Sequence, residues 1–207
     1  MWLGQFNASP SRSHFLAAKH VLCYLAGTQK LSLGLGAPSS NIPVLISSFM
    51  QNFRCSDADW ASETTDRKSI SGYSFYFEGS PVSWSAIKQK SIAPSSTEAA
   101  YYAMTHAFKE ALWLRSFLIF LKFPIPKPFP ILCNNQAACS LSSSPAISAR
   151  SKHINIHHHF LHNHILDGSF STTWIPTEDM PANIFTKALP LVTFSHHHDV
   201  LGLSIPL

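Results

Sequence analysis

The chain has 207 residues, 45% of them hydrophobic, which is enough to bury one ordinary globular core with a short appendage. Fifteen lysines and arginines against eleven aspartates and glutamates give a formal net charge of +4, which is compatible with a polyanionic partner but does not require one. No apolar run reaches the roughly 18 residues of a membrane-spanning helix, and no basic-then-apolar leader opens the chain, so a membrane-spanning or secreted protein is disfavoured.

The four cysteines predict reduced thiols. No two of them form a Cys-x-x-Cys pair, and an isolated cysteine behaves mostly as a small buried apolar residue. We therefore expect an intracellular protein, in the cytoplasm or the nucleus, with mostly buried thiols at Cys23, Cys55, Cys133 and Cys139.

Residues 10–27 predict an amphipathic helix. Its apolar residues recur at helical spacing, and Gly27 supplies a stop. The residues expected on its packing side are Phe15, Ala18, Val21, Leu22 and Leu25. Residues 36–52 carry turn residues without a clear period, and we expect them to form a linker.

Two aspartates follow the next predicted element, a strand that ends near residues 53–56. Asp57 and Asp59 point to the same side if the backbone stays extended, because side chains alternate along a strand. Carboxylates at a strand end are good ligands for a hard cation. A solvated turn is the simpler explanation of the acidic pair taken by itself.

Residues 71–85 predict a hairpin, and a long helix follows it. An aromatic extended run, a Gly-Ser-Pro turn and a returning strand succeed one another, and Trp84 is expected in the core. The helix runs from Ser95 to about Leu121, with Ser95 as its N-cap and Glu98 as the capping-box partner. Its buried side is expected to consist of Ala99, Ala103, Ala107, Leu114 and Leu118.

The second half of the chain alternates short strands with helices. We expect a buried strand at 131–133, a helix beginning at 134–138, a helix at 152–167, a strand at 170–175 and a final helix at 178–187. This order predicts an α/β fold with helices on the faces of a mixed sheet, although the pattern by itself leaves several topologies open.

The segments around the two aspartates resemble a known family. Residues 55–60 read Cys-Ser-Asp-Ala-Asp-Trp, and residues 65–73 read Thr-Asp-Arg-Lys-Ser-Ile-Ser-Gly-Tyr. Both are similar to the opening of the ribonuclease H domain of copia-type retrotransposon Pol polyproteins. The resemblance extends from about Pro10 to Leu203. It implies a ribonuclease H-like mixed five-stranded sheet flanked by helices, with a short N-terminal helical appendage.

The N-terminal helix resembles the end of the reverse transcriptase in the same polyproteins. The matching residues are His14, Ala18, Lys19, Leu22, Tyr24, Leu25, Gly27 and Thr28. The resemblance implies a remnant of the C-terminal end of a reverse transcriptase at 1–35, the linker at 36–52, a ribonuclease H-like domain at 53–190 and a C-terminal tail at 191–207. It also implies the remainder of a reverse transcriptase as a partner, and no membrane.

The family's ribonucleases cut the RNA strand of an RNA–DNA hybrid with two Mg²⁺ ions, which four converging carboxylates hold. The first of the four matches Asp57, the second Ala100, the third Asn134 and the fourth Asn183. Glu98 does not replace the second, because two residues along a helix rotate a side chain by about 200°.

These matches predict a catalytically inactive domain. One of the four positions keeps its negative charge, whereas two Mg²⁺ ions repel one another by several kcal/mol at close range. Asp59 could help Asp57 to bind one ion weakly, so the expected cofactor content is none or weakly bound Mg²⁺. Two alternatives stay open: an active metal-dependent RNA–DNA hybrid ribonuclease, and a decayed transposon product without function.

Basic residues predict nonspecific binding of nucleic acid, an RNA–DNA hybrid in particular. The candidates are Arg67, Lys68, Lys88, Lys90, Arg150, Lys152 and His153. The last three match a family pattern, Arg-x-Lys-His. If the candidates share one face, they contact phosphates and backbone shape rather than base edges. Ordinary solvated lysines on an α/β domain explain the same residues equally well.

Twelve histidines raise the question of a zinc site. His153 and His157, like His158 and His162, are one helical turn apart, which places two imidazoles on one face. Three more follow one another at 196–198. The pattern His-Glu-x-x-His is absent and no cysteine pair joins them, so surface histidines that gain charge below about pH 6.5 are the simpler interpretation.

Overall fold

The computed structural model describes residues 3–35, 54–62, 66–123, 125, 127–144 and 155–205, without the side chains of residues 155–158. The chain forms two compact units, Met1–Gly34 together with Leu203–Leu207, and Leu35–Gly202. The expected linker at 36–52 and the candidates Arg150, Lys152 and His153 lie outside the described residues. Within the described part of the chain, no helix combines the length and apolar character that crossing a bilayer requires.

The smaller unit contains one long helix. Its elements are η1 (Leu3–Phe6), α1 (Arg12–Gly27) and an antiparallel pair of strands, β1 (Ser32–Leu33) and β7 (Leu203–Ser204). Ser11 caps α1: its hydroxyl accepts from the His14 N–H, and its own N–H donates to His14 Nδ1 at 3.1 Å. No residue of α1 is buried, so the predicted packing side of this helix has no core against it within the described residues.

The larger unit is built on a five-stranded mixed sheet, as predicted. The strand order is β4-β3-β2-β5-β6, with β3 antiparallel to both β2 and β4, and with β5 parallel to both β2 and β6. The strands are β2 (Arg54–Asp59), β3 (Ile70–Phe77), β4 (Ser80–Lys88), β5 (Phe129–Cys133) and β6 (Phe170–Trp174). Because β2, β5 and β6 run in one direction, they end at the same edge of the sheet, which we call the carboxyl edge.

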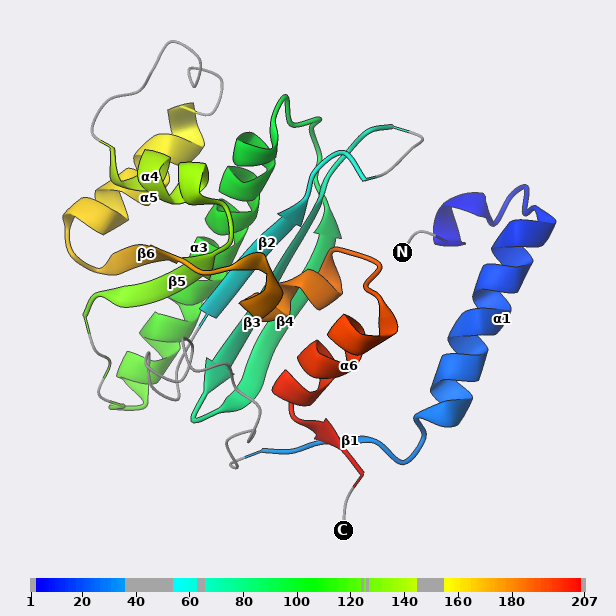
Figure 1. Cartoon of the computed structure of the whole chain (residues 1–207). Coiled ribbons are helices and arrows are strands. Elements are labelled where there is room, and N and C mark those ends of the chain that lie inside the picture. Colours follow the sequence, from blue (N-terminus) through cyan, green and yellow to red (C-terminus); the bar gives the residue numbers. More distant parts are fainter. Residues whose placement is uncertain are drawn as a thin grey trace. The chain divides into compact units, whose positions relative to one another are not determined.

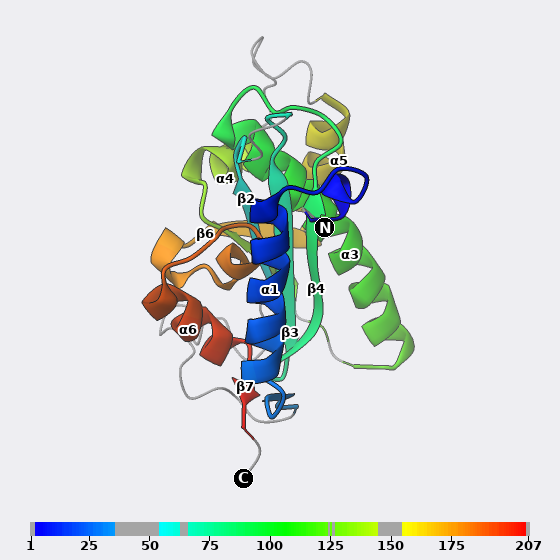
Figure 2. The same cartoon turned by 90° about the vertical axis from the view of Figure 1, so that its right-hand side faces the viewer.

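Helices cover both faces of this sheet. They are α3 (Ser96–Phe120), α4 (Gln136–Ser143), α5 (Asn155–Leu166) and α6 (Leu191–Val200), with short 3-10 helices η3 (Thr177–Asp179) and η4 (Pro181–Phe185). Figures 1 and 2 show α3 on one face of the sheet and α6 on the other. Since η4 contacts β2, β3 and α6, the residues that follow η4 are held close to β2 and β3.

The core lies between α3 and the sheet. Ser95 caps α3 as predicted, and its hydroxyl accepts from the Glu98 N–H at 3.2 Å. The small residues Ala99, Ala103 and Ala107 are buried, which lets the helix approach the strands closely. Larger buried side chains fill the remaining space: Tyr73, Phe75, Met104, Phe108, Phe129, Ile131, Leu161 and Phe170.

Three parts of the larger unit differ from the sequence-based expectation. Trp84 is 53% exposed rather than in the core, because β4 is an edge strand and this side chain alternates with Ser83, which bonds to α3. The expected helix at 178–187 consists of η3 and η4, because Pro181 interrupts a continuous hydrogen-bond ladder and starts a new turn. The expected tail at 191–207 contains α6, which packs against η4.

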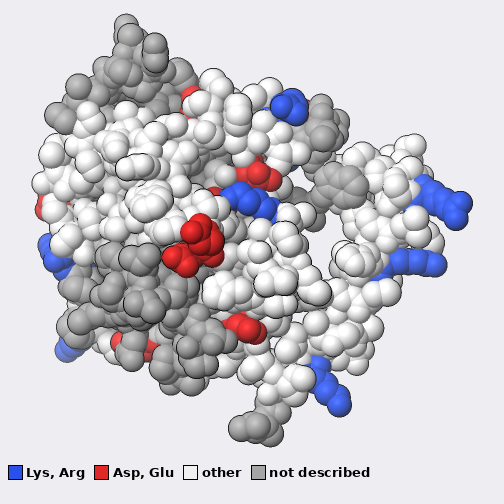
Figure 3. Space-filling view, viewed as in Figure 1, with Lys and Arg blue, Asp and Glu red and all other residues white. Residues whose placement is uncertain are grey.

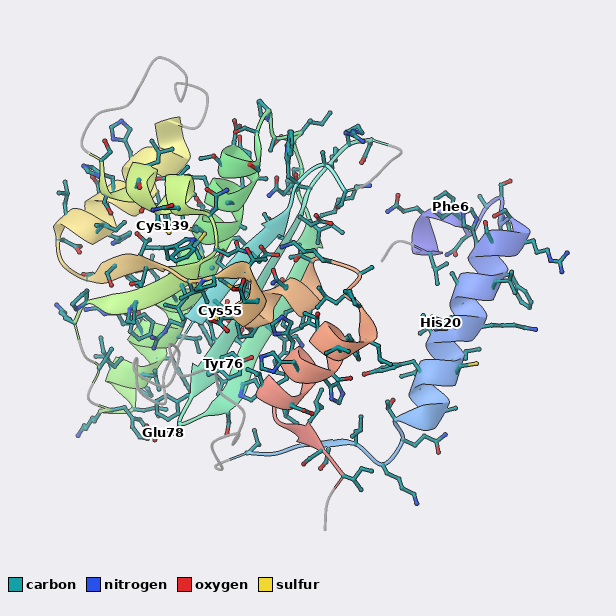
Figure 4. All side chains as sticks on the ribbon, in the orientation of Figure 1. Phe6, His20, Cys55, Tyr76, Glu78 and Cys139 are labelled. Carbon is teal, nitrogen blue, oxygen red and sulfur yellow. The ribbon has the colours of Figure 1, made fainter. Side chains whose placement is uncertain are left out.

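The cysteines are free thiols. Cys55 and Cys133 are buried in neighbouring strands, Cys139 is half-buried, and Cys23 is exposed, so the prediction of buried thiols is wrong for Cys23. Figure 4 labels Cys55 within the sheet and Cys139 on α4. Burial raises the pKa of the Cys55 thiol, which keeps this thiol neutral and suited to the core.

Gly72 allows η4 to lie directly on the sheet. This residue pairs with Asp57 across β2 and β3. A Cβ atom at Gly72 would lie 2.7 Å from Thr186 Cγ2, 3.0 Å from Phe185 Cβ and 3.3 Å from the Ala182 carbonyl oxygen. No side chain therefore fits between the strand and η4 unless η4 moves away.

We expect Gly72→Ala to lower the free energy of unfolding of the larger unit by about 1–3 kcal/mol, because the added methyl group overpacks this contact. Urea denaturation measures the change as a lower midpoint at constant slope. The control is Gly27→Ala in α1, whose added methyl group meets nothing within 4 Å. An unchanged midpoint for Gly72→Ala would contradict the packing of η4 on β3.

Candidate functional site

A polar cluster lies at the carboxyl edge, where β2 and β5 run side by side. Ser56 pairs with Cys133 in this parallel register, so the next residues of the two strands, Asp57 and Asn134, meet. Asn134 Nδ2 donates to Asp57 Oδ1 at 2.9 Å and lies 3.4 Å from Asn183 Oδ1. Three of the four predicted site residues are thus brought together by the fold.

Asn183 enters the cluster from η4. Its Nδ2 donates to the Thr177 carbonyl oxygen at 2.6 Å, which fixes the orientation of the amide. Its Oδ1 accepts from Lys187 Nζ at 2.8 Å. The amide therefore has partners on both sides and is buried, so it is a structural member of the cluster as well as a candidate ligand.

The Asp57 carboxylate is compensated by the residues that follow η4. It is 2% exposed, and Lys187 Nζ lies 3.1 Å from Oδ1 and 3.0 Å from Oδ2. The hydroxyl of Thr186 donates a short hydrogen bond to Oδ2. With Asn134 as a further donor, the carboxylate has an opposite charge and three hydrogen-bond donors around it, which is what a buried carboxylate requires.

Ala100, the fourth predicted site residue, differs from the polar cluster in that its side chain is apolar. It lies near the start of α3 and is buried in the apolar core with Tyr73 and Ala138, and its methyl group has no atom that binds a cation. Glu98, two residues earlier, accepts a hydrogen bond from the Tyr102 hydroxyl at 2.8 Å. This contact agrees with the expectation that Glu98 does not take the place of the second carboxylate.

Asp59 is the second carboxylate near Asp57. Burial raises its pKa, a hydrogen bond with Ser62 and the charge of Lys187 lower it, and the charge of Asp57 raises it again. Among the described residues, no group of three or more histidine, cysteine, aspartate or glutamate side chains could hold a metal ion. One carboxylate already neutralised by an ammonium group, one neighbouring aspartate and two amides do not fit a pair of Mg²⁺ ions.

His197 of α6 is completely buried within electrostatic reach of the cluster. Neither of its ring nitrogens has a hydrogen-bond partner among the described residues. Burial above all, and then the charges of His196 and Lys187, lower the pKa of His197 to about 4, although the charge of Asp57 acts in the opposite direction. The imidazole is therefore neutral at pH 7, and its unmade hydrogen bonds cost folding free energy.

The basic candidates in the described residues lie at the same edge of the sheet, in and beside the loop between β2 and β3. Arg67 is exposed, whereas Lys68 and Lys88 lie 3.8 Å and 3.0 Å from Asp66 Oδ2. Among the described residues that Figure 3 shows, basic and acidic side chains are scattered over the larger unit without a continuous basic patch. On the side shown there, the described residues therefore offer few cations for contact with phosphates.

The sequence-based reasoning did not single out four residues that build the site. Thr186 and Lys187 come three and four residues after Asn183, within the stretch Pro-Ala-Asn-Ile-Phe-Thr-Lys at 181–187 that resembles a family motif, so the motif itself could have identified them. Gly72 also lies in a matched motif, where its role is to leave space. His197 has no sequence signal, because nothing in a run of three histidines tells which one is buried.

No protein-family model matches this chain, but curated proteins do. This chain is 34% identical over 202 residues to the Retrovirus-related Pol polyprotein from transposon RE1 of Arabidopsis thaliana. The match covers 98% of this chain and 13% of that protein. It is 34% identical over 201 residues to the corresponding polyprotein from transposon TNT 1-94 of Nicotiana tabacum, covering 97% and 14%. A shorter match, 41% identical over 112 residues, covers 54% of this chain and 72% of Secreted RxLR effector protein 161 of Plasmopara viticola. The chain thus spans a small part of the polyproteins it matches.

Solved structures of ribonucleases H resemble the fold. LC11-RNase H1, isolated from compost by a metagenomic approach, superimposes with a TM-score of 0.51 at 10% identity, covering 66% of this chain and 92% of that one. RNase H1 from Halobacterium salinarum superimposes with a TM-score of 0.43 at 12% identity, covering 61% and 86%. The likeness to the compost protein shows a ribonuclease H fold and confirms the predicted fold class.

We expect a coupling free energy of about 1–3 kcal/mol between Asp57 and Lys187, because removing the half-buried ammonium group leaves the buried carboxylate without its opposite charge. A double-mutant cycle of Asp57→Asn, Lys187→Met and the double variant, followed by urea denaturation, measures this coupling. Lys187→Met by itself should destabilise the protein, and adding Asp57→Asn should recover part of the loss. Strictly additive effects would show that the ion pair is not formed.

We expect the free energy of unfolding to fall as the pH is lowered from about 6.5 to about 4. In this window the unfolded chain protonates His197, whose ordinary pKa is 6.5, while the folded protein with a pKa of about 4 does not. The loss should reach up to about 3 kcal/mol. His197→Leu should remove this part of the pH dependence and raise stability, whereas His198→Leu on the same helix should retain it. Equal pH profiles for the natural protein and His197→Leu would contradict the burial of this imidazole.

Proposed function

Because this chain belongs to the Pol polyproteins of copia-type retrotransposons and its larger unit has the ribonuclease H fold, we propose that this unit is a catalytically inactive, nonspecific nucleic-acid-binding module. This unit would bind nucleic acid without holding a pair of Mg²⁺ ions. The nucleic acid that the family's ribonucleases act on is an RNA–DNA hybrid. The smaller unit, with α1, would be the remnant of the end of a reverse transcriptase. The polyprotein relationship is the basis for these proposals, because it extends over 98% of the chain, whereas the match to the secreted effector covers 54%.

The observation that carries the proposal is that Ala100, Asn134 and Asn183 bring no negative charge, so that Asp57 is the one carboxylate at the four matched positions and it faces Lys187. The carboxylate and the Lys187 ammonium group lie 3.0 Å apart, so their charges sum to zero. The family motif contains this lysine too, so its presence does not by itself make the site inactive. In an active relative, four carboxylates would outweigh the one lysine and leave an excess of negative charge that attracts divalent cations. Here that excess is missing.

The two asparagines do not restore the missing charge. An amide oxygen can coordinate a cation but brings no negative charge. Both amides are also engaged: Asn134 donates its N–H to Asp57, and Asn183 accepts from Lys187. Each asparagine has nearly the shape of an aspartate, so the fold is retained while the capacity to concentrate metal ions is lost.

Nonspecific binding is supported by the position of the basic residues rather than by their number. Three basic residues lie near the carboxyl edge, where Asp57 also lies: Arg67, Lys68 and Lys88. Lys68 and Lys88 share the carboxylate of Asp66, which reduces the positive charge that they offer to phosphates. Weak binding without base readout is the behaviour that this arrangement favours.

We expect no cleavage of a labelled RNA–DNA hybrid in Mg²⁺ or Mn²⁺ by the natural protein. The variant that combines Ala100→Glu, Asn134→Asp and Asn183→Asp should gain metal-dependent cleavage, because it places four carboxylates around the site. Adding Asp57→Ala to this variant should abolish the gain, and this is its matched control.

In the absence of metal, the triple variant should melt no higher than the natural protein, because clustered carboxylates repel one another. Clear turnover by the natural protein, lost in Asp57→Ala, would overturn the proposed inactivity.

A further inference from the structure

Two tryptophans at the carboxyl edge expose much of their indole surface. Trp60 follows Asp59 at the end of β2, and Trp174 is the last residue of β6. Each is 48% exposed. Exposure by itself does not distinguish these two residues, because Trp84 and Trp113 are 53% and 58% exposed. What sets Trp60 and Trp174 apart is their place at the carboxyl edge, beside the polar cluster.

Each indole is anchored by its N–H group to the backbone. Trp60 Nε1 donates to the Ala93 carbonyl oxygen at 2.9 Å, and Trp174 Nε1 donates to the Asn134 carbonyl oxygen at 3.3 Å. The polar atom of each ring is therefore already satisfied, and what remains for a ligand is apolar, π-electron surface. An anchored ring also loses little conformational freedom on binding, which favours its use as a contact surface.

The two tryptophans are displaced from Asp57 in different directions: Trp60 along the direction of β2, and Trp174 across the strands of the sheet. Trp60 comes three residues after Asp57, one residue beyond the end of β2, so the two Cα atoms are at most about 10 Å apart at the rise of an extended strand. Trp174 pairs with Cys133, which pairs with Ser56, so it lies two strands away across the sheet, also about 10 Å at the usual strand spacing. The anchoring of Trp174 on the backbone of Asn134 connects this ring directly to the polar cluster.

We propose that Trp60 and Trp174 are stacking positions for unpaired bases, so that the larger unit binds single-stranded nucleic acid across the carboxyl edge in preference to a hybrid duplex. This inference rests on the proposed nucleic-acid binding and specifies its substrate class. In a duplex each base is already stacked between its neighbours, whereas the bases of a single strand are free to stack on aromatic side chains.

The charge distribution favours stacking over phosphate contacts as the source of affinity. Lys187 is engaged with Asp57, and Lys68 and Lys88 share Asp66. Among the described basic candidates at this edge, Arg67 and Lys90 remain exposed, so phosphate contacts would add to stacking but rest on few cations. Base–aromatic stacking contributes about 1–3 kcal/mol per base and does not depend on sequence. The binding should therefore be nonspecific and only weakly dependent on salt.

The test compares three fluorescently labelled probes of one mixed sequence: single-stranded DNA, single-stranded RNA and the RNA–DNA hybrid. Fluorescence anisotropy with the full chain should give tighter binding of either single strand than of the hybrid. Trp60→Ala and Trp174→Ala should each weaken single-strand binding about 5- to 150-fold. Comparison of the two single strands shows whether the 2′-hydroxyl contributes.

The chain offers matched controls for these variants. Trp84 and Trp113 are exposed to a similar degree, 53% and 58%, but lie within β4 and α3 rather than at the carboxyl edge. Trp84→Ala and Trp113→Ala should leave binding unchanged. Trp60→Phe and Trp174→Phe keep an aromatic face without the anchoring N–H, so they should retain part of the affinity even if an alanine variant fails to fold.

The outcomes separate this inference from the proposal on which it rests. Tighter binding of the hybrid than of the single strands, or unchanged single-strand affinity in folded Trp60 and Trp174 variants, would overturn the stacking positions while nucleic-acid binding stands. Absence of binding to all three probes would overturn both. Catalytic inactivity is tested separately, by the cleavage assay with the triple variant.

Discussion

The buried carboxylate of Asp57 is the constraint on which the site depends. A carboxylate that is 2% exposed has to regain in hydrogen bonds and opposite charge what it loses in hydration. Asn134 supplies a donor from the neighbouring parallel strand, and Thr186 and Lys187 supply a donor and a charge from the segment after η4. This segment reaches the carboxylate because Gly72 leaves room for η4 on the sheet.

The contacts that stabilise Asp57 also decide what the site can do chemically. In the proposed function two Mg²⁺ ions are not held, because one carboxylate paired with an ammonium group and two uncharged amides offset too little of the repulsion between the ions. A fold that presents strand ends and loops at one edge still offers a binding surface, because binding a nucleic acid does not require metal ions. The proposed function therefore separates two properties of a ribonuclease H fold: retention of the nucleic-acid surface, and loss of the metal centre.

Much of the architecture follows from local sequence patterns. The hairpin, the long helix capped by Ser95 and the strand at 131–133 were all predictable, since capping residues and alternating or helical spacing act over a few residues. The elements that were mispredicted depend on context. Trp84 belongs to an edge strand whose outer face has no cover among the described residues, and Pro181 divides a segment whose composition resembles a helix. Neither the edge position nor the division into η3 and η4 is visible in local periodicity.

The sequence by itself determined the family, the order of the strands and helices of the larger unit up to β6, and the identities Asp57, Ala100, Asn134 and Asn183 at the matched positions, because each is written in a contiguous motif. The tertiary structure decided how those residues are used. It brought Asn134 and Asn183 to Asp57, placed Lys187 on the carboxylate, buried His197 without a hydrogen-bond partner among the described residues, and anchored Trp60 and Trp174 at the carboxyl edge. The physical reason is that hydrogen bonds, burial and ion pairs join residues far apart in the chain, such as Lys187 and Asp57 at 130 positions, and no local pattern records such distances.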